Sequence, residues 1–153
     1  MTEDLFEPRC SAFAGRIRDS FAKQGLMETF EAHLVSVACG HVVIEMAFSP
    51  KATQQHGFQH GGAIAAVLDS ACGYAGLSVM AVDSAVLTVE FKINFLAPAD
   101  GVRFRFEGEV IKPGRTIVPA DGRAYAIAAD GKEKLIATMS CTLMAVQGRG
   151  LEG

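Results

Sequence analysis

The sequence predicts an α+β fold in which one antiparallel sheet packs against one long, buried helix. Residues 62–80 are almost all apolar or small, as expected of a helix that is covered on most sides. The segments before and after them alternate like strands, without the strand–helix–strand repeat of a parallel sheet. The 153 residues, half of them apolar, suffice for one compact domain.

The chain is expected to begin with a short helix followed by a hairpin. Over residues 9–24 apolar side chains recur at every fourth position, and Gly25 is expected to end this amphipathic helix. Residues 30–38 and 42–48 are apolar and β-prone, and the Cys-Gly-His sequence between them is typical of a tight turn. Two strands therefore precede the long helix.

Four more strands are expected after the long helix, which gives a sheet of six. Their ranges are 87–95, 102–110, 116–128 and 134–145. The first alternates strictly and is the clearest strand in the sequence. The last two are joined at residues 129–131, where Ala-Asp-Gly indicates a hairpin turn. Pro119 and the Asp121-Gly122 pair interrupt the third, so a bulge or a late start is expected there.

Composition and charge argue against several classes of protein. The net charge of −3 and the absence of a Lys/Arg cluster argue against a nucleic-acid partner. Asp69, in the middle of the long apolar stretch, argues against a membrane span. The acidic first residues lack a basic-then-apolar signal pattern, so a cytoplasmic location is expected.

The four cysteines are expected to be reduced and buried. Cys10, Cys39, Cys72 and Cys141 are far apart, form no CxxC pair and lie within apolar runs. The alternative is one reactive thiol with a histidine partner, which no local pattern favours.

Residues 54–62, with the sequence QQHGFQHGG, raise the question of a metal or phosphate site. His56 and His60 are spaced to share a helix face, but the surrounding glycines argue against a helix there. The glycine spacing also fits no phosphate-binding loop. What remains is a helix beginning near Gly61, whose first N–H groups are free to hold an oxyanion. Alternatively, the glycines only let the chain pass close to a neighbour.

Asp69 is the only Asp, Glu, Lys or Arg residue between Lys51 and Asp83. A carboxylate on a largely buried helix needs a structural partner or a catalytic role, and the sequence leaves both open. Eight helical residues separate it from Gly61, about 12 Å along the axis, too far for both to act on one atom. If they serve one reaction, the amide of one chain must meet the carboxylate of another, as in a symmetric dimer.

Three motifs in this order resemble a known family. They are His60-Gly61-Gly62 followed by Asp69, the stretch VEFKINFLAPA over residues 89–99, and the Gly114-Arg115 turn. They are similar to the hotdog-fold acyl-CoA thioesterases of the phenylacetic-acid-degradation type, in the 4-hydroxybenzoyl-CoA thioesterase-like superfamily. The resemblance covers residues 30–146. Residues 1–29 would form an N-terminal helical segment and residues 147–153 a flexible tail.

The resemblance implies a fold, an assembly and a set of catalytic residues. A central helix would be wrapped by a six-stranded antiparallel sheet, in a homodimer that shares its active sites and pairs into a homotetramer. Asp69 would activate water or attack the thioester carbonyl, and the Gly61 N–H would polarise that carbonyl. His60 would position the site, Gln54 would fill the place of a loop Asn or Gln, and Thr88 would orient the water.

The resemblance also implies substrate contacts. The residues expected to contact substrate are Gln55, Gly62, Lys112, Arg115 and Thr116. The last three would face the CoA phosphates, although a solvated turn is an equal alternative. Which of the two adjacent glutamines faces the site is left open, and His56 has no assigned role. No metal and no cofactor are implied.

The function expected from these residues is hydrolysis of an acyl-CoA thioester to the free acid and CoA. A non-catalytic acyl-CoA binding or sensing protein on the same fold is the alternative, and a hotdog hydratase is a third. The intact Asp69 favours chemistry over binding alone. The sequence does not identify the acyl group.

Overall fold

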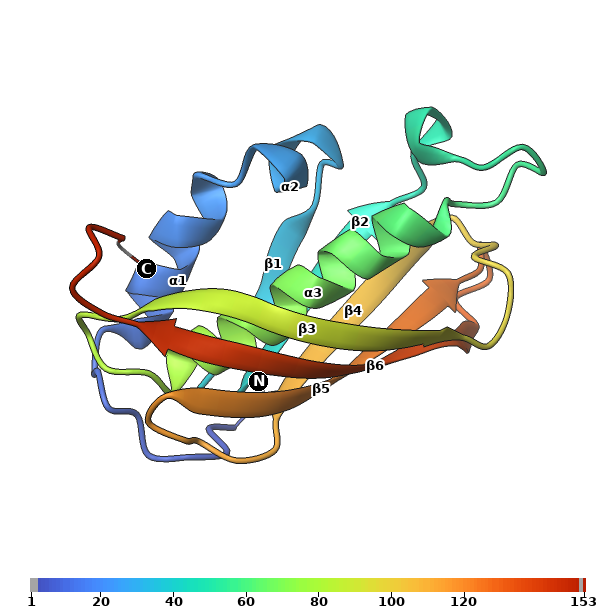
Figure 1. Ribbon diagram of the computed structural model, residues 1–153. Coiled ribbons are helices and arrows are strands. Elements are labelled where there is room, and N and C mark those ends of the chain that lie inside the picture. The colour runs from blue at the N-terminus through green and yellow to red at the C-terminus, as the bar shows by residue number, and fades with distance from the viewer. Residues whose placement is uncertain (1–2, 152) are drawn as a thin grey trace.

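The computed structural model describes residues 3–151 and residue 153, so residues 1, 2 and 152 of the two predicted terminal segments lie outside the described part. A six-stranded sheet curls around one long helix, α3, and two short helices precede the sheet (Figure 1). The elements in chain order are α1 Phe13–Ala22, α2 Gly25–Thr29, β1 His33–Ala38, β2 His41–Ala47, the 3-10 turn Pro50–Ala52, α3 Gly61–Ser78, β3 Ala85–Phe95, β4 Arg103–Val110, β5 Ile117–Ile127 and β6 Glu133–Val146. The predicted α+β class is confirmed, and the arrangement is that of the hotdog fold.

The sheet has the order β1-β2-β4-β5-β6-β3, and every neighbouring pair is antiparallel. Strand β3, which the sequence marks most clearly, therefore lies at an edge. It presents exposed apolar side chains, namely those of Leu87, Val89, Phe91 and Phe95. A long apolar edge strand is a natural place for a second chain to pair.

Helix α3 fills the concave side of the sheet. Its sequence is rich in Ala and Gly, which lets the strands come close. At Gly108 a Cβ atom would collide with the carbonyl of Ala71, and at Gly122 it would lie 2.9 Å from the Cys72 sulfur. These two glycines therefore permit the contact between helix and sheet. No helix in the described part of the chain has both the length and the apolar character needed to cross a membrane.

The four cysteines are all buried and free of disulfides, as the sequence predicts. A hydrogen bond with Cys141, the largest cause, and burial together raise the pKa of the Cys72 thiol well above its ordinary value. Both thiols lie at the contact between α3 and the sheet, where small apolar groups are needed.

The prediction that Gly25 ends helical structure is wrong. Helix α1 stops at Ala22, and the chain is extended at Gln24, so the break falls one residue earlier. Gly25 then begins α2, a five-residue helix that buries Met27 in the core. A helix this short shows too little periodicity to be read from sequence.

The bulge or late start expected at Pro119 is also wrong. Strand β5 begins at Ile117 and runs without a break through Pro119, Asp121 and Gly122. The last pair of β5 with β4 is Ala120 with Val110, so the missing N–H of Pro119 is not needed there. Its carbonyl still accepts from the Ile111 N–H at 2.9 Å. The irregularity lies instead between Ala124 and Tyr125.

Candidate functional site

The loop that leads into α3 is held by Gln59, a polar residue that is only 2% exposed. Its side-chain oxygen accepts from the Ser49 N–H at 2.9 Å, and its amide group donates to the carbonyls of Ser49 and Ala52. Its own N–H donates to the Ala99 carbonyl at 3.0 Å. Sequence reasoning missed this residue, because nothing in the pattern marks which glutamine of this loop points inward.

The start of α3 is organised by His60, the N-cap residue. Its Nδ1 atom accepts from the Gly62 N–H at 2.7 Å, and its carbonyl accepts from the N–H groups of Ala63 and Ile64. The Gly62 amide, predicted to contact substrate, is thus used within the cap. Among the described residues, no acceptor faces the N–H of Gly61. This donor, at the positive end of the helix dipole, is available to a ligand.

The two histidines of this loop do not share a helix face. His60 lies at the helix start, and His56 lies in the turn before it, where its N–H donates to the side chain of Gln54. The sequence-based argument that the glycines prevent a helical His pair is therefore confirmed.

A cavity of about 470 Å³ opens beside the start of α3. Its lining residues include Gln54, Gly61, Phe95 and Pro98. Gln55 is exposed and absent from the lining, and its side chain lies 3.4 Å from His56 Nε2. Of the two adjacent glutamines, it is thus Gln54 that faces the cavity with the free amide.

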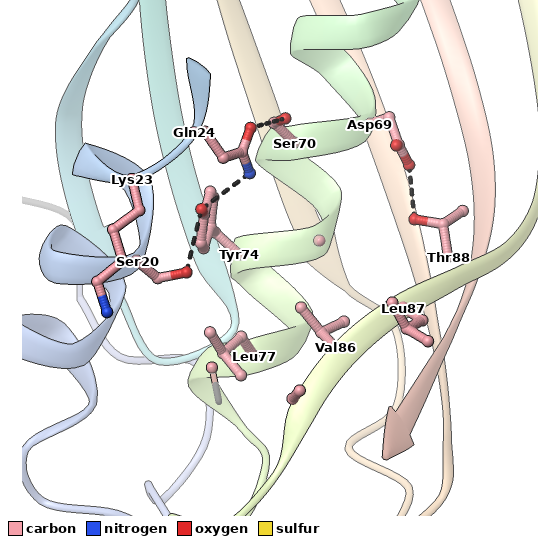
Figure 2. Close-up of a pocket in the computed structure, with 13 residues that line it drawn as sticks. Ser20, Lys23, Gln24, Asp69, Ser70, Tyr74, Leu77, Val86, Leu87 and Thr88 are labelled. Carbon is pink, nitrogen blue, oxygen red and sulfur yellow. Dashed lines mark hydrogen bonds between the residues drawn. The ribbon is translucent and has the colours of Figure 1, made fainter. Parts of the chain in front are cut away.

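Asp69 lies in the middle of α3 and points toward β3. The Thr88 hydroxyl donates to its Oδ1 atom at 2.8 Å (Figure 2). The pairing of β3 with β6 shifts register between Thr88 and Glu90, and an irregularity of this kind can redirect a side chain near a site. Burial raises the pKa of Asp69 above its ordinary value, while the Thr88 hydrogen bond lowers it and only partly offsets burial. The group is a carboxylate with increased basicity.

A second cavity, of about 510 Å³, adjoins Asp69 between α1, α3 and β3. It is lined by Ser20, Lys23, Gln24, Asp69, Ser70, Gly73, Tyr74, Leu77, Ala85, Val86, Leu87, Thr88 and Gly153. Figure 2 shows Ser20 and Gln24 hydrogen-bonded to Tyr74 and Ser70 on one side of α3, with Asp69 and Thr88 on the other side. Sequence reasoning found only Asp69 and Thr88 of this set, because the others belong to segments whose proximity no local pattern reveals.

Within one chain, Asp69 and the Gly61 amide do not meet. Each borders its own cavity, and the two linings have no residue in common. Both lie on α3, eight residues apart, which corresponds to about 12 Å along the helix axis. The separation inferred from the sequence is therefore present in the structure.

The predicted CoA-binding turn lies elsewhere. Lys112, Arg115 and Thr116 connect β4 to β5, are exposed, and line neither of these two cavities. Arg9 holds this turn by donating to the carbonyls of Pro113 at 2.7 Å and Gly114 at 3.2 Å. Their contact with CoA stays a prediction.

Comparison with known proteins identifies the family of this chain. A family model described as Thioesterase superfamily matches residues 56–128. A Thioesterase family protein from Silicibacter pomeroyi is 53% identical, with a TM-score of 0.87, over 89% of this chain and 99% of that one. A 1,4-dihydroxy-2-naphthoyl-CoA hydrolase of Listeria monocytogenes is 26% identical over 78% of this chain and 94% of its own length.

A third similar protein is a thioesterase enzyme from Staphylococcus aureus, crystallised as a Gln-to-Ala variant. It is 26% identical, with a TM-score of 0.72, over 80% of this chain and 98% of that one. The match to the Silicibacter pomeroyi protein spans nearly all of that chain at more than half identity. The chain therefore belongs to the thioesterase superfamily, as a hotdog-fold thioester hydrolase.

Proposed function

We propose that this protein hydrolyses acyl-CoA thioesters at a site built from two subunits, with Asp69 from one and the Gly61 N–H from the other. The observation that carries the proposal is the placement of these two groups. A carboxylate of raised pKa and an unpaired helix-start amide lie on one helix, too far apart to act together within one chain. A symmetric dimer brings each carboxylate to the other chain's amide.

The chemistry follows from the two groups. The Asp69 carboxylate takes a proton from water as the water oxygen bonds to the thioester carbon, or it attacks that carbon itself. The carbonyl oxygen becomes negative and accepts from the Gly61 N–H, which costs little reorganisation because the helix already fixes it. The carbon–sulfur bond then breaks, and the CoA thiolate takes up a proton. Direct attack adds one step, in which water hydrolyses the anhydride with Asp69.

The edge strand β3 supports a shared site. Thr88, whose hydroxyl donates to Asp69, belongs to this strand. The exposed apolar side chains of β3 come both before and after Thr88 in the strand. Pairing of two copies through β3 would cover these side chains and bring a second chain to the mouth of the Asp69 cavity. In this proposal the homodimer is the smallest active form.

The relatives support the positions of Gln54 and Asp69 and a CoA ester as substrate. The Staphylococcus aureus thioesterase has been crystallised with a glutamine and, separately, a glutamate replaced by alanine, fifteen positions apart. Gln54 and Asp69 have the same separation. The Listeria protein acts on a CoA ester, which supports CoA as the carrier. The phenylacetic-acid-degradation role, the homotetramer and the cytoplasmic location stay predictions.

The test is hydrolysis of a panel of acyl-CoA esters, followed through the released CoA thiol. Asp69→Asn keeps the acceptor for Thr88 and removes the base, so we expect kcat to fall by at least about a hundredfold. Asp130→Asn is the matched control, because Asp130 lies in the exposed β5–β6 turn. Wild-type turnover in the Asp69 variant would refute the proposal, and tight binding without turnover in the wild type would favour an acyl-CoA sensor.

A further inference from the structure

The cavity beside Asp69 has one apolar and one polar wall. Leu77, Ala85, Val86 and Leu87 supply the apolar side, as expected for an acyl group. The polar side consists of Ser20 on α1, Gln24 just after α1, and Ser70 and Tyr74 on α3, which are joined by hydrogen bonds (Figure 2). A plain hydrocarbon chain would gain nothing from these groups.

Two hydrogen-bond donors of the polar wall have no acceptor among the described residues. Gln24 donates one N–H to the Tyr74 hydroxyl at 2.8 Å, and the Ser70 hydroxyl donates to the Gln24 oxygen at 3.2 Å. Ser20 and Tyr74 lie 3.3 Å apart and share a single hydrogen bond, although each has its own proton. Within the described residues, one of these two hydroxyl protons and the second Gln24 N–H have no acceptor. A bound oxygen atom would satisfy both.

Tyr74 is well placed for such recognition. It is buried, and its ring packs on Phe21 with the ring centres 5.8 Å apart, so its hydroxyl is held in place. It lies five residues after Asp69, which corresponds to a rise of about 7.5 Å along the helix and a rotation of about 140°, so the two side chains lie on different sides of α3 (Figure 2). Because the rise is only the axial part of the separation, a chain of about six carbons is the shortest acyl group that would bring an oxygen at its far end toward Tyr74 with its carbonyl at Asp69.

Gly73 provides the room between the two ends. It lines the cavity, and a Cβ atom built on it would meet no atom within 4 Å. The space next to it is thus open to a ligand. The only cation of the lining, Lys23, is exposed, so the polar wall offers neutral donors and no buried charge for a carboxylate.

We propose that this cavity holds the acyl group, and that Gln24 and Tyr74 select acyl groups with a neutral hydroxyl or keto oxygen remote from the thioester. This inference depends on the proposed function in one respect, which is the position of the thioester carbonyl at Asp69. Helix α1 and the residues directly after it are then a specificity wall of the site. Gln24 and Tyr74 determine selectivity and do not touch the reacting carbonyl.

The experiment compares hexanoyl-CoA with 6-hydroxyhexanoyl-CoA. In the wild type, the hydroxylated ester should have a kcat/KM about tenfold or more above that of hexanoyl-CoA, because it satisfies donors that the plain chain leaves buried and unpaired. Tyr74→Phe keeps the ring and removes the hydroxyl, so this ratio should fall toward one. Tyr125→Phe is the matched control, since the other tyrosine of the chain lies on β5 over Arg105 and outside this cavity.

A second variant tests the location of the acyl group. Gly73→Leu should fill the open space, lower hydrolysis of both six-carbon esters and spare acetyl-CoA. Gly15→Leu is its control, because Gly15 is also free of neighbours but is exposed on α1. Equal loss of activity on acetyl-CoA and hexanoyl-CoA in a folded Gly73→Leu protein would overturn the placement.

Binding separates this proposal from the proposed function. Calorimetry with the non-hydrolysable S-hexyl-CoA and S-(6-hydroxyhexyl)-CoA gives a ratio of Kd values that needs no turnover. If the wild type shows the preference and Tyr74→Phe abolishes it, the inference stands even where no ester is hydrolysed. If hydrolysis proceeds but Tyr74→Phe leaves both ratios unchanged, the inference fails and the proposed function stands.

Discussion

At the scale of single residues, the acidity of Asp69 results from two opposed effects. Burial disfavours the ionised carboxylate and raises its pKa, while the hydrogen bond from Thr88 favours the ionised form and lowers it. A base whose pKa is raised toward neutrality accepts a proton more readily, but it is lost to protonation at a higher pH. If Asp69 is the base, as proposed, the hydroxyl of Thr88 sets the pH at which activity begins on the acidic side.

Thr88→Val should move the acidic limb of the pH–rate profile to higher pH. The change removes the hydrogen bond that favours the carboxylate, so the pKa of Asp69 rises and the base is protonated at pH values where it is ionised in the wild type. The measurement is kcat/KM against pH. Thr142→Val is the control, since the Thr142 hydroxyl donates to Glu90 instead. A limb that stays in place, or moves to lower pH, would contradict the assignment.

Gly61→Pro should lower kcat by about a hundredfold to a thousandfold, the range observed when one oxyanion donor is lost. Proline is well accommodated at the first position of a helix, and the extended conformation of His60, with φ −61° and ψ 136°, suits a residue before proline. The substitution therefore removes the N–H with little other change.

Gly61→Ala is the control for that variant. Its Cβ would lie 3.1 Å from the Phe95 ring, as in the proline variant, but the N–H remains. If both variants lose the same activity, crowding by Phe95 explains the loss and the amide has no special role. Steady-state hydrolysis of one acyl-CoA ester is sufficient to compare them.

At the scale of elements, close packing of α3 on the sheet depends on two glycines in neighbouring strands. Gly122→Ala should destabilise the fold by about 1–3 kcal/mol, because its Cβ would lie 2.9 Å from both the Cys72 sulfur and a Leu68 methyl carbon. Denaturant unfolding measures the effect. Gly15→Ala is expected to stabilise α1 slightly, since nothing lies near it. Unchanged stability of the Gly122 variant would mean that helix and sheet separate easily.

The sequence predicts the long elements well and the short or interrupted ones poorly. Helix α3 and strand β3 are long enough for their periodicity to be unambiguous, and both form where expected. Helix α2 is too short to show a pattern. Pro119 looks like a strand breaker in the sequence. Whether it breaks the strand depends on the neighbouring strand, and β4 needs no N–H at that position.

The same limit applies to the site. His60, Gly61, Gln54 and Asp69 lie within sixteen consecutive residues, so their order can be recognised in the sequence. Gln24 and Tyr74 are fifty residues apart and meet only because α1 packs on α3. No pattern in one sequence indicates such a pair, and the polar wall is therefore visible only in the structure.

At the scale of the whole molecule, the shared site predicts that two inactive proteins can restore each other. In the proposed homodimer, subunits with Asp69→Asn and subunits with Gly61→Pro would each form inactive dimers. A mixed dimer has one site with both intact groups and one with neither. Random mixing gives half mixed dimers, so about a quarter of wild-type activity should return.

The measurement is hydrolysis after co-expression or co-refolding of the two variants, with each variant alone as the control. Mixing either variant with a subunit that carries both substitutions should restore nothing, because no site in that pair is complete. Activity of the first mixture that stays at the level of its parents would place both groups in the same chain, contrary to the separation along α3.

The position of α1 in the chain has a consequence for how this protein can change. The family match covers residues 56–128, which include His60, Gly61, Asp69 and Thr88, whereas α1 lies well before that stretch. Of the proposed specificity wall, Ser20 and Gln24 thus lie outside the stretch that holds the proposed hydrolytic groups, while Tyr74 lies within it. If the proposed specificity wall is correct, substitutions at Ser20 and Gln24 would alter which acyl groups are accepted while the hydrolytic groups stay unchanged, so that new substrates would become accessible without rebuilding the catalyst.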